Sequence, residues 1–160
     1  QPYVRFMEIS LILMITHSLS ALGLLLLCFI QYKWKQDGKN LKGIEREKKL
    51  KKHEEIGKKL LLLLSFVILL AILGNLISGL NSGKTILKSI IPRSPHGAFG
   101  FIGAALFYYT WKLGMKTKQQ RIAKEKWSET KRKHGRASDL IIIIGCIHGF
   151  LGFLQLLKII

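Results

Sequence analysis

The chain is poor in cysteine and in acidic residues. Only nine of its 160 residues are Asp or Glu, against 26 Lys or Arg, so the net charge is +17. Its two cysteines, Cys28 and Cys146, both lie inside apolar runs, which is typical of buried thiols rather than of a disulfide framework. The motif CxxCH does not occur, and its absence argues against a covalently attached c-type haem.

A nucleotide-binding loop is also missing. The segment from Gly79 to Thr85 (GLNSGKT) resembles a P-loop, but the spacing between its glycines is one residue short. No strand is predicted before it either, whereas a P-loop follows a strand. The segment is therefore predicted to be a turn after the second long helix.

Long apolar runs are the main feature that is present. Hydrophobic residues make up 49% of the chain, and they are separated into blocks from the charged residues. Four runs, 9–32, 60–79, 97–115 and 139–160, reach the length of about 20 residues that a helix needs to cross a bilayer. Because backbone groups in lipid must be hydrogen bonded within their own segment, the runs are predicted to be helices. The predicted fold is all-α, a four-transmembrane-helix bundle in one membrane domain covering residues 1–160.

The basic residues are distributed unevenly between the segments that join these runs. The segments 33–59 and 112–136, predicted to be loops, hold 21 of the 26 Lys and Arg residues, and the connection 80–95 holds three. The positive-inside rule assigns the lysine-rich side to the cytoplasm or stroma. We call it side B and the opposite side, with both termini, side A. Trp34 and Trp111 end two runs at side B, as interfacial aromatic residues do.

This topology accounts for the charge without a nucleic acid. Juxtamembrane basic segments attract anionic lipids. The lipid membrane is therefore the expected partner of the basic segments, and no nucleic-acid partner is predicted.

Four of the five histidines fall into two pairs of matched depth. His17 precedes Trp34 by 17 residues and His96 precedes Trp111 by 15, which places them about 25 and 22 Å from side B at the helical rise. His53 and His134 are predicted to open the second and fourth helices at side B. Facing imidazoles on different helices are what axial ligation of a haem iron requires. The sequence thus predicts two non-covalent b-type haems, ligated by His17 and His96 and by His53 and His134.

Small residues near some of these histidines favour the haem interpretation. Gly57 follows His53 by four positions, and Gly100 follows His96 by four, which would leave room for a porphyrin. His17 and His134 are followed at the same spacing by Ala21 and Ser138, which are larger than glycine and support the interpretation less. His53 and His134 also lie among lysines and arginines, where an interfacial histidine needs no ligand. Candidate partners for haem propionates or another anion are the basic residues around this pair: Lys51, Lys52, Lys58, Lys59, Arg132 and Arg136.

His148 is the fifth histidine. It follows His134 by 14 residues, or about 21 Å of helix, and therefore lies near the side A pair. It can replace a ligand, line a quinone pocket or fill the core, and the sequence favours a core residue.

The pattern resembles a known family, domain of unknown function 4079, membrane proteins of cyanobacteria and chloroplasts that are similar to cytochrome b561. The resemblance covers about residues 17–157. The segments that carry it are His17, Tyr32-Lys33-Trp34, Lys52-His53 with Gly57, Gly83-Lys84, Pro95-His96 with Gly100, and Arg132 with His134. It implies a four-helix, b-type haem fold in a thylakoid membrane, with His17, His53, His96 and His134 as ligands. His148 matches no histidine of the family.

Three functions remain open at this stage. The first is a dihaem electron-transfer protein that takes electrons from ascorbate or a quinone across or within the membrane. The second is a non-catalytic accessory subunit of a larger photosynthetic membrane complex, which would bind haem or a pigment structurally and for which Gly145 and Gly149 offer a small-xxx-small face. The third is a small transporter or channel, which the polar groups at depth (His17, His96, His148 and Asn75) support poorly, because no carboxylate accompanies them.

Overall fold

The computed structural model describes residues 2–157, and the side chains of residues 7–157. Within this range the chain forms five α-helices: α1 (Pro2–Asn40), α2 (Gly43–Asn81), α3 (Ile86–Ile90), α4 (Pro95–Ile122) and α5 (Ser128–Leu156). The described part contains no strand, so the predicted all-α class is confirmed for it. Residues 158–160, the end of the predicted fourth run, lie outside the described residues.

The lysine-rich segments are not loops, which corrects the prediction for 33–59 and 112–136. α1 continues to Asn40, and only Leu41 and Lys42 separate it from α2. At the second segment, only residues 123–127 lie between α4 and α5. Lys, Arg, Glu and Gln are good helix formers, and these segments lack proline, so nothing in them ends the helices where the apolar runs end. Each helix therefore extends well beyond its apolar run.

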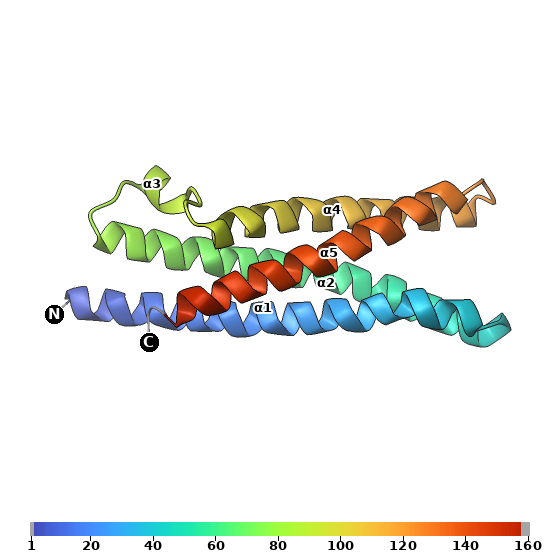
Figure 1. The fold of residues 1–160 in the computed structure, drawn as a ribbon, viewed down its shortest axis with the longest axis horizontal. Helices are drawn as coiled ribbons and strands as arrows, with labels where there is room; N and C mark the ends of the chain where they lie inside the picture. Colours follow the sequence, from blue (N-terminus) through green and yellow to red (C-terminus); the bar gives the residue numbers. More distant parts are fainter. Residues whose placement is uncertain (1, 158–160) are drawn as a thin grey trace.

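Four long helices form an antiparallel bundle (Figure 1). α1 packs against α2 and α5, and α4 packs against α5 and α2, so the four close into a ring. The short α1–α2 and α4–α5 connections lie at one end of the bundle, and the start of α1 and the end of α5 lie toward the other. This is the relative arrangement of termini and lysine-rich segments that the sequence predicts.

The predicted turn in GLNSGKT lies at Ser82 and Gly83, because the first three residues of the segment still belong to α2. Gly83 has a positive φ of +70°, which glycine adopts without strain, and the Lys84 N–H donates to the Gly79 carbonyl at 2.9 Å. A Cβ on Gly79 would collide with the side chain of Ser89, so the glycine lets α3 fold back onto the end of α2. The next helix, α4, starts at Pro95, where the Ser94 hydroxyl accepts a hydrogen bond from the Gly97 N–H at 3.1 Å.

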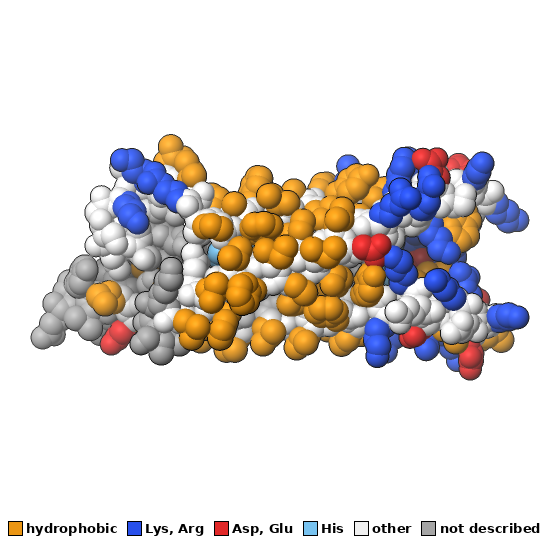
Figure 2. Space-filling model, viewed as in Figure 1, with side chains coloured by type: hydrophobic (Ala, Val, Ile, Leu, Met, Phe, Trp, Pro, Cys, Tyr) orange, Lys and Arg blue, Asp and Glu red, His pale blue; other side chains and the backbone are white. Residues whose placement is uncertain are grey.

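The outer surface of the bundle is apolar along its middle (Figure 2). Large side chains such as Leu62 and Phe101 are 73% exposed. The buried hydrophobic residues among those described are few: the cluster of Leu24, Cys28, Leu60 and Val67, and besides it Leu70, Leu113 and Ala137. A water-soluble domain does not leave an apolar belt of this extent uncovered. Three helices, within Met7–Asn40, Gly43–Asn81 and Ser128–Leu156, are long and apolar enough to cross a membrane. The chain therefore has the build of a membrane-spanning protein.

The glycines proposed for association with another protein have a contact within the chain. A Cβ on Gly145 would lie 3.1 Å from a methyl group of Leu25 on α1, and one on Gly149 would lie 3.7 Å from the same side chain. Gly145 therefore serves a close contact between α1 and α5 within the chain, whereas a Cβ on Gly149 would make only an ordinary contact.

Candidate functional site

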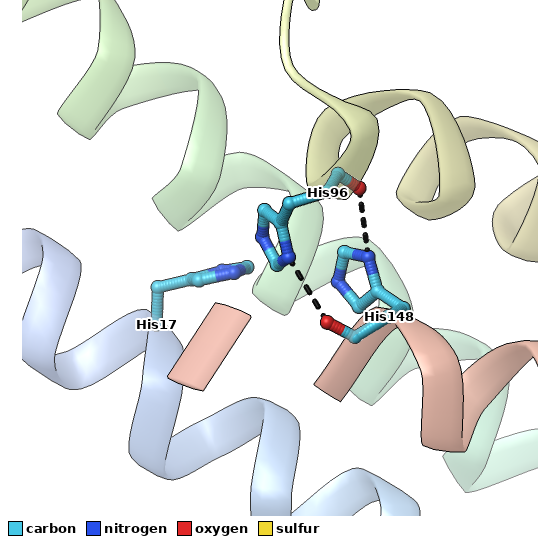
Figure 3. Close-up of side chains that lie close together, drawn as sticks. All are labelled: His17, His96 and His148. Carbon is cyan, nitrogen blue, oxygen red and sulfur yellow. Dashed lines mark hydrogen bonds between the residues drawn. The ribbon is translucent and has the colours of Figure 1, made fainter. Parts of the chain in front are cut away.

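Three histidines meet near side A, one each from α1, α4 and α5 (Figure 3). The ligand nitrogens of His17, His96 and His148 all lie within 4.8 Å of one another. The rings of His17 and His96 are nearly perpendicular, at 88°, with centroids 6.3 Å apart. The rings of His96 and His148 stack at 3.9 Å with an angle of 18°. The structure thus brings together the predicted side A pair and adds His148 to it.

Each of these imidazoles is oriented by a backbone carbonyl. Nδ1 of His17 lies 3.0 Å from the Val67 carbonyl on α2. Nδ1 of His96 lies 3.0 Å from the carbonyl of His148, and Nδ1 of His148 lies 3.0 Å from the carbonyl of His96. Because a carbonyl oxygen only accepts, Nδ1 must carry the proton in all three. Nε2 is left with a free lone pair, as in metal-ligating histidines.

Two glycines make the reciprocal contact of His96 and His148 possible. In a helix the side chain at position i+4 lies over position i, so it normally covers the carbonyl there. Gly152 follows His148 by four positions, and a Cβ on it would lie 2.8 Å from Cε1 of His96. Gly100 follows His96 by four, and its Cβ would lie 2.7 Å from Cε1 of His148. The space at Gly100, interpreted above as room for a porphyrin, is therefore taken by an imidazole.

The predicted side B pair also comes together. The ring centroids of His53 on α2 and His134 on α5 are 6.3 Å apart, and the ring planes make an angle of 82°. Nδ1 of His134 donates to the Thr110 carbonyl at 3.0 Å, and Gly114, four residues after Thr110, leaves room for this ring. His134 is therefore oriented as His96 and His148 are, by a backbone carbonyl that a glycine four residues later leaves uncovered.

His53 is held differently. Its ring stacks on Trp34 of α1 with centroids 5.7 Å apart, and its Nδ1 has no hydrogen-bond partner among the described residues. Gln31 donates instead to the His53 carbonyl at 2.8 Å, beside Gly57. A Cβ on Gly57 would lie 3.8 Å from this amide nitrogen, an ordinary contact, so Gly57 is not needed to uncover the carbonyl as Gly100, Gly114 and Gly152 are.

The positions of His53 and His134 within their helices differ from the prediction. His53 lies ten residues after the first residue of α2, and His134 lies six residues after the first residue of α5. They do not open these helices, because the helices begin in the lysine-rich segments. The two histidines nevertheless lie at the same depth, because both helices are extended at the same end of the bundle.

A cavity of about 660 Å³ lies between the helices at side B. His53, His134, Trp34 and Trp111 line it, and so do four glycines: Gly38, Gly57, Gly114 and Gly135. Its volume is in the range of cofactor pockets, about 300–1,000 Å³. The indole Nε1 of Trp111 and Nδ1 of His53 are buried without a partner in the described part of the chain. Buried polar atoms are usually satisfied, so the Trp111 N–H, which can only donate, marks this cavity as the place of a group with acceptor atoms.

Nine basic residues line the same cavity, and only three of them are among the six that were predicted. Lys58, Arg132 and Arg136 line it as expected, whereas Lys51, Lys52 and Lys59 are exposed elsewhere on α2. The basic residues that the sequence analysis missed are Lys35, Lys39, Arg46, Lys118, Arg121 and Lys131. They were assigned to loops. Helical periodicity, if continued through the lysine-rich segments, places them on the inward faces of the helices.

Two carboxylates neutralise part of this charge and join helices. Glu54 on α2 accepts hydrogen bonds from Lys118 at 2.6 Å and from Arg121 at 2.8 Å, both on α4. Asp139 on α5 accepts from the Tyr32 hydroxyl at 2.7 Å and also pairs with Lys35, both on α1.

Arg132 and Arg136 differ from these paired residues. Neither has a carboxylate partner among residues 7–157. With Lys131, which also lines the cavity, they are the basic residues on α5 that can receive an anionic group there.

The arrangement is that of two facing imidazole pairs in a membrane bundle, one of them beside a cavity with positively charged walls. Comparisons of the chain with family models, with curated proteins and with solved structures find no match.

Proposed function

We propose that the protein is a transmembrane b-type cytochrome that holds two haems and passes electrons between them. His17 and His96 would ligate the iron at side A, and His53 and His134 the iron at side B. The observation that carries the proposal is the spacing of 6.3 Å between ring centroids, which is the same in both pairs.

This spacing fits axial ligation of one metal by two imidazoles. With a metal–nitrogen bond of about 2.0 Å and a ring centroid about 1.1 Å behind the nitrogen, opposed ligands place their centroids about 6.2 Å apart. Directly packed imidazoles come closer, as the stacked pair of His96 and His148 does at 3.9 Å. Both predicted pairs are therefore held apart by about the width that an iron would need.

The hydrogen bonds of the imidazoles support the same role. The carbonyls of Val67, His148 and Thr110 fix the Nδ1–H tautomer of His17, His96 and His134, which leaves Nε2 as the ligand atom. Such hydrogen bonds also raise ligand basicity and hold the ring orientation.

The side B cavity fits the cofactor in chemistry as well as in volume. Haem brings an apolar macrocycle with two carboxylates, and it supplies the one-electron chemistry of its iron. Glycines and aromatic rings line the cavity, and its unpaired Arg132, Arg136 and Trp111 Nε1 suit carboxylate oxygens. The Nε1 of Trp111 and the two guanidiniums would hold the propionates.

The two sites are far apart along the bundle. His134 and His148 lie on one helix and are separated by 14 residues, which corresponds to about 21 Å along the helix. Electrons would therefore move about 21 Å along the bundle, part of it through the hydrocarbon layer. In this proposal α4 crosses the membrane together with the three helices that meet the length and apolarity requirement.

The orientation and the partners form part of the proposal. Side B faces the cytoplasm or stroma, since it carries most of the basic residues. Its charge would attract an anionic reductant such as ascorbate, and a quinone is the alternative partner. Membership of the domain of unknown function 4079 family and a thylakoid location follow from the resemblance of sequence motifs and are proposed with it.

A spectrum of the purified protein tests the proposal. We expect a reduced-minus-oxidised difference spectrum of the b type and a pyridine haemochrome value near two haems per chain. A value near one would leave one pair as a haem site, and the absence of haem after expression with ample haem supply would refute the proposal. An accessory subunit would hold haem without electron transfer, so reduction of an acceptor enclosed in proteoliposomes by an external reductant separates the two hypotheses.

A further inference from the structure

Side A holds one imidazole more than axial ligation of a haem requires. His148 is oriented in the same way as the proposed ligands, with its Nδ1 bonded to the His96 carbonyl at 3.0 Å. This hydrogen bond leaves Nε2 of His148 free to bind a ligand. The glycine at position 100, which admits its ring, is a further element built around His148.

The three imidazoles come from three helices and converge. Their ligand nitrogens lie within 4.8 Å of one another, and each ring is half-buried. A tetrahedral ion with bonds of about 2.0–2.1 Å to nitrogen needs its ligand atoms about 3.3 Å apart, so binding requires the stacked rings of His96 and His148 to turn toward a common point. Figure 3 shows the free edges of His96 and His148 facing the tip of His17.

We propose that His17, His96 and His148 form a binding site for one first-row divalent metal ion of the Zn²⁺ type. Neutral imidazole is a preferred ligand of Zn²⁺, Co²⁺, Ni²⁺ and Cu²⁺. Three protein ligands leave a fourth position for water or another small ligand, as in zinc sites that bind substrates. Two of the three histidines are also proposed haem ligands, so the ion and a haem exclude each other at side A.

The approach to the site supports binding from water. His96 is the second residue of α4 and follows the connection from residue 91 to 94 at the side A end of the bundle. A hydrated ion therefore needs to pass only the first turn of a helix. The side B pair has two histidines, with no third among the described residues near it, and serves as the internal control.

Metal binding can be measured on the full chain produced in haem-limited cells and purified in detergent. Co²⁺ is the probe, because tetrahedral coordination gives it a distinct visible absorption, and Zn²⁺ should displace it. We expect one Co²⁺ per chain. His17→Ala and His96→Ala should weaken binding at least about tenfold, whereas His134→Ala should leave it unchanged.

His148→Asn is the decisive variant. The amide nitrogen of Asn can keep the hydrogen bond to the His96 carbonyl while the ligand atom Nε2 is removed. We expect this variant to lose Co²⁺ binding and, when haem is supplied, to retain the side A haem signal. Unchanged Co²⁺ affinity in His148→Asn, or the absence of binding in the haem-poor wild type, would overturn the proposal.

The outcomes for the two proposals are distinct. Failure to incorporate haem at side A would contradict the proposed function and leave the metal site standing. Two haems per chain with no Co²⁺ binding in the haem-poor protein would support the proposed function and overturn the metal site.

Discussion

His96 and His148 hold each other through two equivalent hydrogen bonds, each from the Nδ1–H of one ring to the carbonyl of the other residue at 3.0 Å. The contact joins the first turn of α4 to the last third of α5. It depends on Gly100 and Gly152, which leave the two carbonyls uncovered. The orientation of a proposed ligand is thus set by residues that never touch the cofactor.

Adding a methyl group at either glycine should disturb side A alone. In Gly152→Ala the new Cβ would lie 2.8 Å from Cε1 of His96, so the ring must move. We expect loss or a marked shift of the side A haem signal and a stability cost of about 1–3 kcal/mol, typical of overpacking. Gly23→Ala is the matched control, because nothing lies within 4 Å of its Cβ position. Equal spectra for Gly152→Ala and Gly23→Ala would contradict the geometry.

Replacing single histidines should divide the four proposed ligands into two classes. His17→Ala and His96→Ala should remove one and the same spectral component, because each leaves the same iron with one ligand. His53→Ala and His134→Ala should remove the other. Low-temperature spectra and redox titrations of the four variants measure this. If His53→Ala and His17→Ala removed the same component, the pairing would be wrong.

The Trp111 indole should help to retain the side B cofactor. Its Nε1 is buried without a partner and lines the cavity, so a propionate would give it a hydrogen bond. A hydrogen bond to a charged group contributes about 1.5–3 kcal/mol, and Trp111→Phe should therefore release haem from side B at least about tenfold more readily. Transfer of haem to an excess of apomyoglobin reports the rate. The side A component should be lost at the rate found in the wild type.

The two carboxylates at side B should differ in their contribution to stability. Asp139 and its partner Lys35 are 38% and 43% exposed, so Asp139→Asn should cost less than about 1 kcal/mol. Glu54 is 17% exposed and pairs with both Lys118 and Arg121, and Glu54→Gln should cost about 2 kcal/mol because it leaves two cations without a counter-charge. Thermal unfolding in detergent compares the two. A larger loss in Asp139→Asn would refute the ranking.

The topology is open to chemical labelling. In a variant with Cys28 and Cys146 replaced by Ser, single cysteines at Lys42 and at Lys124 lie in the two short connections. Both should react with a membrane-impermeant maleimide from the same face of oriented vesicles, and a cysteine at Ser82 from the opposite face. Labelling of positions 42 and 124 from different faces would rule out the proposed bundle topology.

Residue spacing predicted that His17 lies near His96 and His53 near His134, because helices that alternate in direction convert a count of residues into depth. For His148, which stacks on His96, the sequence favoured a core residue instead. The partners of each Nδ1 were not predictable in this way. They depend on how two helices are rotated toward each other, as with Gly100, which serves His148 on α5 rather than a group beside His96.

The ends of the helices were the main error. Apolar length identifies the part of a helix that lies in lipid, but it does not say where the helix stops. Residues 33–40 and 43–59 remain helical since Lys and Glu favour helix and the chain turns only at Leu41 and Lys42. For this reason Lys39, Arg46 and Lys118 were not recognised as lining the cavity.

The extended helices place the two histidine sites in different surroundings. A helix of 39 residues is about 58 Å long, roughly twice the thickness of the hydrocarbon layer. His53 precedes Leu60, where the apolar run of α2 begins, by seven residues, or about 10 Å, whereas His17 lies inside the apolar run of α1. The side B cavity therefore stands at the level of the lipid headgroups, where water and mobile ions screen charge, and the side A cluster stands in a medium that screens it poorly. A charge in the side B cavity is therefore screened within a short distance, whereas a charge in the side A cluster acts on the other helices over a longer range.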